Sequence, residues 1–168
     1  MATSFSDQRV GVLVDIQNLY YSAKVLYKKK VNFNAILKEG TNERKLIRAI
    51  GYGVKTIEGA EKNFFEALEK GGYDIKTKDL QIFPDGSKKG DWDVGIAVDA
   101  IKMANKMDVI VLVSGDGDFI PLIQYLQSTY GCRVEIVAFK ESTNATVIEI
   151  CDKFTNLSSD KRKYLMAK

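Results

Sequence analysis

The sequence of 168 residues contains no histidine. This absence excludes every mechanism that needs an imidazole, including Ser-His-Asp and Cys-His hydrolysis, HExxH metalloproteases and histidine-ligated zinc sites. An enzyme of this composition must therefore work with carboxylates, lysines, hydroxyls or a bound metal ion.

Cysteine and long apolar runs are also scarce. The two cysteines, Cys132 and Cys151, form no CxxC motif, which excludes thiolate zinc sites and thioredoxin-type redox chemistry. This usage is typical of a reduced, intracellular protein, and we expect a cytoplasmic one. The longest strongly apolar run, residues 109–113, is too short to cross a bilayer, and residues 1–9 lack the apolar stretch of a signal peptide. We expect no membrane partner.

The charge is nearly balanced, with 25 basic and 22 acidic residues and a net charge of +3. The whole excess lies in residues 158–168, while residues 1–157 are neutral overall. A chain of this length and composition predicts one domain. We therefore expect a single domain over residues 1–157 and a basic C-terminal tail over residues 158–168, either solvated or in contact with nucleic acid.

Apolar runs alternate along the chain with amphipathic segments, which predicts an α/β fold with a parallel sheet between two helical layers. We expect strands at 10–14, 46–55, 73–83, 109–113 and 133–139. Helices are expected at 17–27, around 35–37, and at 60–70, 91–106, 119–129 and 143–151, with a turn-rich loop at 84–90. In such sheets, ligands bind beyond the carboxyl ends of the strands.

Carboxylates follow two of the predicted strands directly. Asp15 comes immediately after the strand at 10–14, and Asp116 and Asp118 follow the strand at 109–113. Neighbouring strands lie about 5 Å apart, so these three carboxylates would converge at one sheet edge if the two strands are adjacent. The glycines that flank Asp116 allow the sharp turn that this convergence needs.

Further polar residues are expected near the same edge. Asp93 lies in the first turn of a predicted helix, and Asp99 lies about 120° around that helix from it, so we rank Asp99 lower as a ligand. Asn18 follows Asp15 by about one helical turn and can position a phosphate or a metal-bound water. Ser114 and Thr143 also follow strands, where their hydroxyls either cap helices or touch a phosphate.

Several like charges cannot all ionise in one cleft without a counter-charge. Mg²⁺ supplies that charge, binds a few carboxylates and leaves positions for water and phosphate oxygens. Such a site activates water and stabilises the leaving oxygen of a phosphodiester without histidine. A calcium loop is excluded because its spacing and distal glutamate are missing. A haloacid-dehalogenase site is disfavoured because position 17 is glutamine.

Four segments carry a family resemblance. They are Asp-Ile-Gln-Asn at 15–18, the segment from Lys89 to Asp99, Ser-Gly-Asp-Gly-Asp-Phe at 114–119 and the segment 152–157. Together they resemble the NYN domain, LabA branch, of the PIN-like superfamily, over residues 9–157. The resemblance implies a three-layer α/β/α sandwich with a mainly parallel five-stranded sheet of order 3-2-1-4-5. It also implies a metal-dependent ribonuclease-type site, whose positions match Asp15, Asn18, Asp93, Asp99, Asp116 and Asp118.

From the residues and the resemblance together, we expect a phosphodiesterase that depends on Mg²⁺ or Mn²⁺ and acts on RNA, which we expect to be single-stranded. Lys88 and Lys89, with Ser114 and Thr143, are the candidate substrate-binding residues, since the two lysines lead directly into Asp93. Two alternatives remain open at this point: a non-catalytic RNA-binding or regulatory module that keeps the acidic pocket, and a metal-dependent phosphatase. Assembly as a homodimer is also open.

Overall fold

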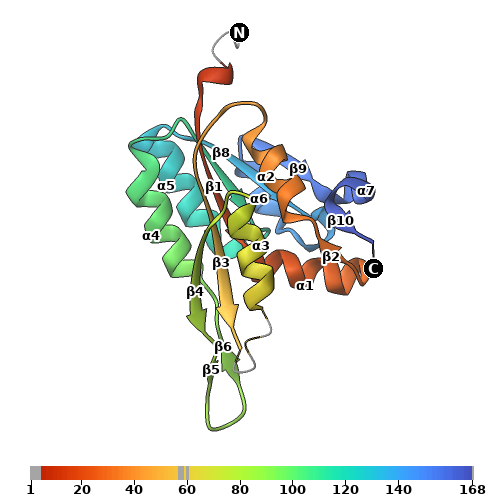
Figure 1. Ribbon diagram of the computed structural model, residues 1–168. Helices are drawn as coiled ribbons and strands as arrows, with labels where there is room; N and C mark the ends of the chain where they lie inside the picture. The colour runs from red at the N-terminus through yellow and green to blue at the C-terminus, as the bar shows by residue number, and fades with distance from the viewer. Residues whose placement is uncertain (1–4, 57–58, 60, 168) are drawn as a thin grey trace.

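The centre of the protein is a six-stranded sheet in which every strand pairing is parallel (Figure 1). The computed structural model describes residues 5–56, 59 and 61–167. Across the sheet the strands are β4 (Asp74–Asp79), β3 (Lys45–Lys55), β1 (Arg9–Asp15), β7 (Val109–Val113), β8 (Arg133–Ala138) and β9 (Lys153–Asn156). The first five, counted along the chain, have the expected order 3-2-1-4-5.

The expected strand pattern is wrong in several details. The expected strand at 73–83 is divided after residue 79 into two strands, β4 and β5 (Gln81–Ile82), that belong to different sheets. A sixth strand, β9, extends the sheet beyond β8; it is short, partly polar and half-buried, so it lacks the apolar run of the other strands. The expected loop at 84–90 contains β6 (Lys88–Lys89), which pairs with β5 in an antiparallel hairpin. The expected helix start at residue 60 lies outside the described residues.

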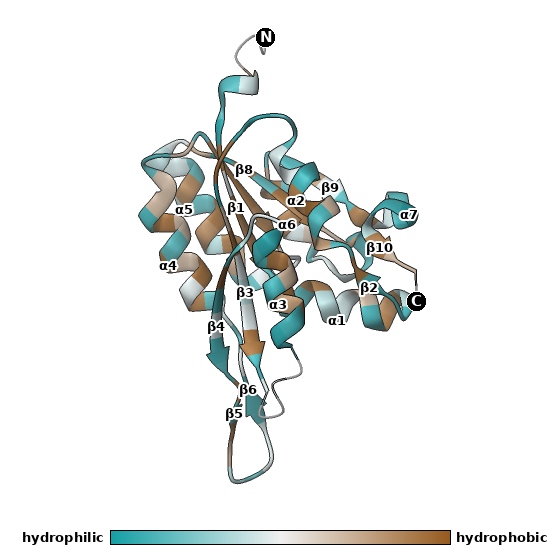
Figure 2. Ribbon diagram, viewed as in Figure 1, coloured by the Kyte–Doolittle hydropathy of each residue, from teal (hydrophilic) through white to brown (hydrophobic). Residues whose placement is uncertain are grey.

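Helices cover both faces of the sheet. One layer consists of α1 (Ile16–Tyr27), α2 (Phe33–Thr41), α3 (Lys62–Lys70) and α7 (Lys161–Tyr164). The other consists of α4 (Asp93–Ala104), α5 (Ile120–Tyr130) and α6 (Ala145–Ile150). Alternate strand residues feed the two cores: Val12 packs with the first layer and Leu13 with the second. The central strands are apolar on both faces, and Figure 2 shows them in brown.

Short elements complete the chain. Single 3-10 turns lie at Phe5–Asp7, Gly117–Phe119, Lys140–Ser142 and Leu157–Asp160. The basic segment at the C-terminus contains α7 and then β10 (Leu165–Met166), which pairs antiparallel with β2 (Lys30–Val31). Tyr164 and Leu165 are buried, and the Tyr164 hydroxyl donates to Glu39 Oε1 at 2.7 Å. α7 therefore packs against α2, and the chain after it pairs with β2 through residue 166.

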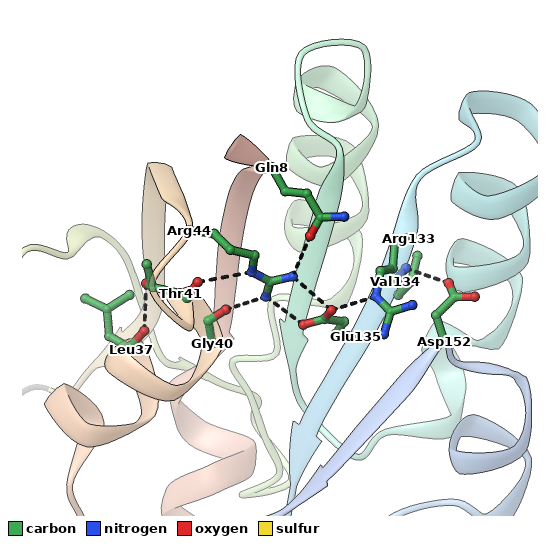
Figure 3. A network of polar contacts seen from close by, with 9 residues as sticks. All are labelled: Gln8, Leu37, Gly40, Thr41, Arg44, Arg133, Val134, Glu135 and Asp152. Carbon is green, nitrogen blue, oxygen red and sulfur yellow. Dashed lines mark hydrogen bonds and ion pairs between the residues drawn. The ribbon is translucent and has the colours of Figure 1, made fainter. Parts of the chain in front are cut away.

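A buried ion pair joins the loop before β3 to β8, toward the amino ends of the strands (Figure 3). The Arg44 guanidinium donates to both carboxylate oxygens of Glu135, at 2.8 and 3.0 Å, and Arg133 Nε donates to the same carboxylate at 2.8 Å. The remaining Arg44 donors reach the Gln8 side chain and the carbonyls of Gly40 and Thr41. Burial alone raises the pKa of Glu135, but the hydrogen bonds from Arg44 and Arg133 hold it below its usual value.

Candidate metal centre

The site begins where β1 and β7 end beside each other. Val14 pairs with Val113, so Asp15, the last residue of β1, and Ser114, the first residue after β7, lie together at the carboxyl edge of the sheet. Asp15 caps α1, its Oδ1 accepting from the Asn18 amide at 3.3 Å, and its Oδ2 accepts from the Ser114 hydroxyl at 3.5 Å. Ser114 Oγ in turn accepts from the Asp116 amide at 3.3 Å. Ser114 thus links the two carboxylate-bearing segments.

The turn after β7 is held by close backbone packing. The Gly115 amide donates to Asn18 Oδ1 at 3.2 Å, and the Asp118 amide donates to Asp116 Oδ1 at 2.9 Å. A Cβ at Gly115 would lie 2.6 Å from Thr143 Oγ1 and 2.9 Å from its Cα, and one at Gly117 would lie 2.6 Å from Asn144 Nδ2. Both positions need glycine because the loop before α6 lies against the turn.

Three carboxylates meet at this edge. One oxygen each of Asp93, Asp116 and Asp118 lies within 4.8 Å of the others. Asp93 is the first residue of α4, and its amide donates to Asp91 Oδ1 at 3.3 Å. Within residues 5–56, 59 and 61–167, no lysine or arginine lies within 4.0 Å of these three carboxylates or of Asp15. We call Asp93, Asp116 and Asp118 the acidic cluster.

Burial and the lack of a counter-charge together raise the pKa values of two carboxyl groups at this site. Burial raises the pKa of Asp15 to about 6, and the nearby charge of Asp116 adds to that effect against the hydrogen bonds from Asn18 and Ser114. Partial burial and the surrounding carboxylates, Asp116 and Asp91 foremost, raise the pKa of Asp93 to about 7. A bound cation would relieve this repulsion.

Asp99, the weaker candidate ligand, is not part of the acidic cluster. Its Oδ2 accepts from Lys76 Nζ and from the Tyr52 hydroxyl, each at 2.8 Å. Burial raises its pKa, but these two hydrogen bonds hold it below the usual value. The Tyr52 ring packs on Trp92 at 5.3 Å between centroids, and Trp92 Nε1 donates to the Gly53 carbonyl at 2.8 Å. Asp99 therefore belongs to a network under the start of α4.

The four candidate substrate-binding residues lie in three places. Ser114 is buried between Asp15 and the turn. The Thr143 hydroxyl donates to the Phe139 carbonyl at 2.7 Å, beside Gly115. Lys88 and Lys89 are exposed on the β5–β6 hairpin, which projects past the end of the sheet (Figure 1).

One residue at the site, Asn144, was not predicted from the sequence. The Asn144 amide donates to the Gly115 carbonyl at 3.0 Å, and its side chain caps α6 while touching the position of Gly117. Asparagine is a preferred N-cap residue, so its place near the start of the helix expected at 143–151 is the signal that could have identified it.

Comparison with known proteins identifies the family. The NYN domain family model matches residues 9–158, nearly the whole described chain. The chain belongs to the NYN domain family. Low amplitude and bright protein LabA of Synechococcus elongatus is 30% identical, with 74% of this chain and 71% of that protein aligned, which supports the LabA branch.

The structural comparison shows the same fold in a second protein. The crystal structure of VPA0982 from Vibrio parahaemolyticus, titled a protein of unknown function, is 32% identical. It covers 96% of this chain and 98% of its own, with a TM-score of 0.87. NYN domains have the PIN-like nuclease fold, are associated with RNA and generally use divalent metals. No helix in the described part of this NYN domain is long and apolar enough to cross a membrane.

Proposed function

We propose that this NYN domain is a phosphodiesterase that uses Mg²⁺ or Mn²⁺ to cleave RNA. The main support for this proposal is the acidic cluster. Its three carboxylates lie close together, and no lysine or arginine of the described residues pairs with them. The family supplies the substrate class, because NYN domains are associated with RNA.

The cluster fits a small, hard cation. Its donors are all carboxylate oxygens, the ligands that Mg²⁺ and Mn²⁺ prefer. Asp93 and Asp116 are half-buried and Asp118 is exposed, so the cluster is open to solvent and to a phosphate on one side. Partial burial and the neighbouring carboxylates together raise the pKa of Asp93, as expected of a group whose charge the chain leaves uncompensated.

When bound, such an ion lowers the pKa of a coordinated water and stabilises the leaving oxygen of the phosphodiester. The residues of the chain divide the remaining work. Asp93, Asp116 and Asp118 would hold the ion. Asp15 adds negative charge behind them and orients the turn through the Ser114 hydroxyl.

Asn18 would contact the substrate. Its Oδ1 is used by the Gly115 amide, while its Nδ2 has no hydrogen-bond acceptor in the described part of the chain. That free donor suits a phosphate oxygen or a metal-coordinated water. We place single-stranded RNA at the site because an unpaired backbone can bend to bring one phosphate to a half-buried cluster.

The test is incubation with labelled single-stranded RNA and its duplex form, with Mn²⁺ or with EDTA. We expect Mn²⁺-dependent cleavage, preferentially of the single strand. Asp116→Asn should lower the rate by at least about 100-fold and weaken Mn²⁺ binding in calorimetry, with an unchanged fold. Asp7→Asn, which removes an exposed carboxylate of the first 3-10 turn, is the matched control and should behave as wild type.

Full cleavage by Asp116→Asn, or cleavage that EDTA leaves unaffected, would contradict the metal mechanism. A protein without Mn²⁺ affinity that binds RNA in a salt-sensitive way would favour the binding module instead.

A further inference from the structure

Two strands continue past the edge that carries the acidic cluster. Asp15, the last residue of β1, pairs with Tyr52, but β3 runs on to Lys55, and β4 pairs with it as far as Asp79. The chain then forms the β5–β6 hairpin, which Figure 1 shows projecting farthest from the helical layers. We call residues 53–55 and 77–90 the strand extension.

The strand extension carries lysines that the described chain leaves without a carboxylate partner. No acidic oxygen of the described residues lies within 4.0 Å of Lys78, Lys88 or Lys89. Lys78 and Lys89 line a hollow of about 350 Å³ together with Asp79, Gln81 and Gly90. The one carboxylate in this lining is outnumbered by the two ammonium groups.

Contacts fix this surface relative to the acidic cluster. Lys78 Nζ lies 4.7 Å from the centroid of the Trp92 ring, and Trp92 directly precedes Asp93. The bond from Trp92 Nε1 to the Gly53 carbonyl ties the same ring to β3. A cationic surface therefore stands beside an anionic cluster, on the side where α4 begins.

We infer that the strand extension binds the sugar–phosphate backbone of the RNA on the Asp93 side of the acidic cluster. Lys78, Lys88 and Lys89 each contact a phosphate. Because Lys78 covers the Trp92 ring, the contact is to phosphates rather than through base stacking, so it is independent of sequence. The role in cleavage rests on the proposed function, whereas the binding itself does not.

The test measures binding of fluorescent single-stranded RNA in EDTA at several salt concentrations. The variant Lys78→Gln, Lys88→Gln, Lys89→Gln should bind at least about 10-fold more weakly at low salt. Its log K against log [salt] should be less steep by about 2, since each lost phosphate contact on a single strand removes about 0.7.

The matched control is Lys38→Gln, Lys70→Gln, Lys106→Gln, which removes the same charge from the last turns of α2 and α3 and the segment after α4. It should keep the wild-type slope, and circular dichroism should show both variants folded. With Mn²⁺, the strand-extension variant should raise KM and leave kcat and Mn²⁺ affinity unchanged.

Equal losses of RNA affinity in the two triple variants would overturn this inference, and so would wild-type binding by the strand-extension variant. Neither result would contradict the proposed cleavage reaction. A slope that changes only in the strand-extension variant would support it, even in a protein that neither binds Mn²⁺ nor cleaves RNA. The inference and the proposed reaction can therefore fail separately.

Discussion

Glu135 and Asp15 are both buried carboxylates of the central sheet, 5% and 8% exposed, but they lie in opposite electrostatic surroundings. Glu135 receives two bonds from Arg44 and one from Arg133, and its pKa is held below the usual value (Figure 3). From the described residues, Asp15 receives bonds only from an amide and a hydroxyl, and burial raises its pKa to about 6. The same chemical group is thus compensated in one region and uncompensated in the other.

The two carboxylates therefore differ in role: Glu135 stabilises the fold, and Asp15 lies in a region that is a candidate for function. At Glu135 the chain supplies two guanidinium groups, so this carboxylate holds the loop before β3 against β8 and needs no cation from outside the chain. Near Asp15 the chain places the carboxylates of Asp116 and Asp91, and no lysine or arginine of the described residues pairs with it. Neighbouring groups with strongly shifted pKa values are candidates for function, and the raised pKa values of Asp15 and Asp93 mark this region as one.

The largest effect is expected from breaking the compensated region. Arg44→Met leaves Glu135 buried with Arg133 as its remaining charged partner, and it removes the bonds to Gly40, Thr41 and Gln8. Removing one partner of a buried pair costs about 3–5 kcal/mol, so urea unfolding should show a loss of that order. Mn²⁺ affinity of the folded protein should not change.

The double variant Arg44→Met, Glu135→Leu provides the control. Replacing both partners with apolar side chains removes the uncompensated charge and should recover most of the lost stability. A single variant as stable as wild type would show that Arg133 alone compensates Glu135. Arg44 would then not be needed to offset the buried charge.

A smaller effect is expected from Gly115→Ala, which disturbs the uncompensated region without removing a charge. The added methyl would meet the Thr143 backbone at 2.9 Å, so the turn that carries Asp116 must move. We expect a loss of about 1–3 kcal/mol in stability, as for other overpacked sites, and a several-fold loss of Mn²⁺ affinity in calorimetry.

Gly11→Ala is the matched control, because the atoms nearest to its methyl would be those of the flexible Met103 side chain and the Ile110 side chain, in the layer of α4. It should cost stability without affecting the metal. Equal Mn²⁺ affinity in Gly115→Ala and wild type would show that the geometry of the turn does not control the cluster.

The sequence predicted what depends on local pattern. Apolar runs located the central strands, and the rule for carboxyl edges brought Asp15, Asp116 and Asp118 to the same edge of the sheet. The partly polar strand β9 escaped because it is recognisable only by its pairing with β8.

Partners far apart in the chain could not be predicted. Lys76 and Tyr52 both donate hydrogen bonds to the Asp99 carboxylate, because they are paired residues of β4 and β3. The spacing of residues along α4 does not reveal these partners. Likewise, Arg44 and Glu135 are 91 residues apart, and the sequence around neither residue predicts that they form an ion pair.

The smallest effect on stability is expected from Asp93→Asn. Its sign tests whether the carboxylates near Asp15 are uncompensated, in contrast to Glu135. The pKa of Asp93 rises from an ordinary 3.8 to about 7 on folding, so between these values the folded state binds more protons than the unfolded state. Stability from this group is therefore lost as pH rises from about 4 to 7. Asparagine should flatten that slope and raise metal-free stability at pH 7.5, by about 1 kcal/mol after allowance for solvent screening.

Urea unfolding at pH 5 and pH 7.5, with EDTA or Mn²⁺, measures this effect. Mn²⁺ should reverse the order of the two proteins, because a ligand that binds only the folded state stabilises the one that binds it better, which is wild type. Glu135 has the opposite sign, since its lowered pKa contributes stability that is lost as pH falls. If Asp93→Asn were less stable than wild type in EDTA at pH 7.5, the carboxylate would already be compensated within the chain, and the contrast between the two regions would fail.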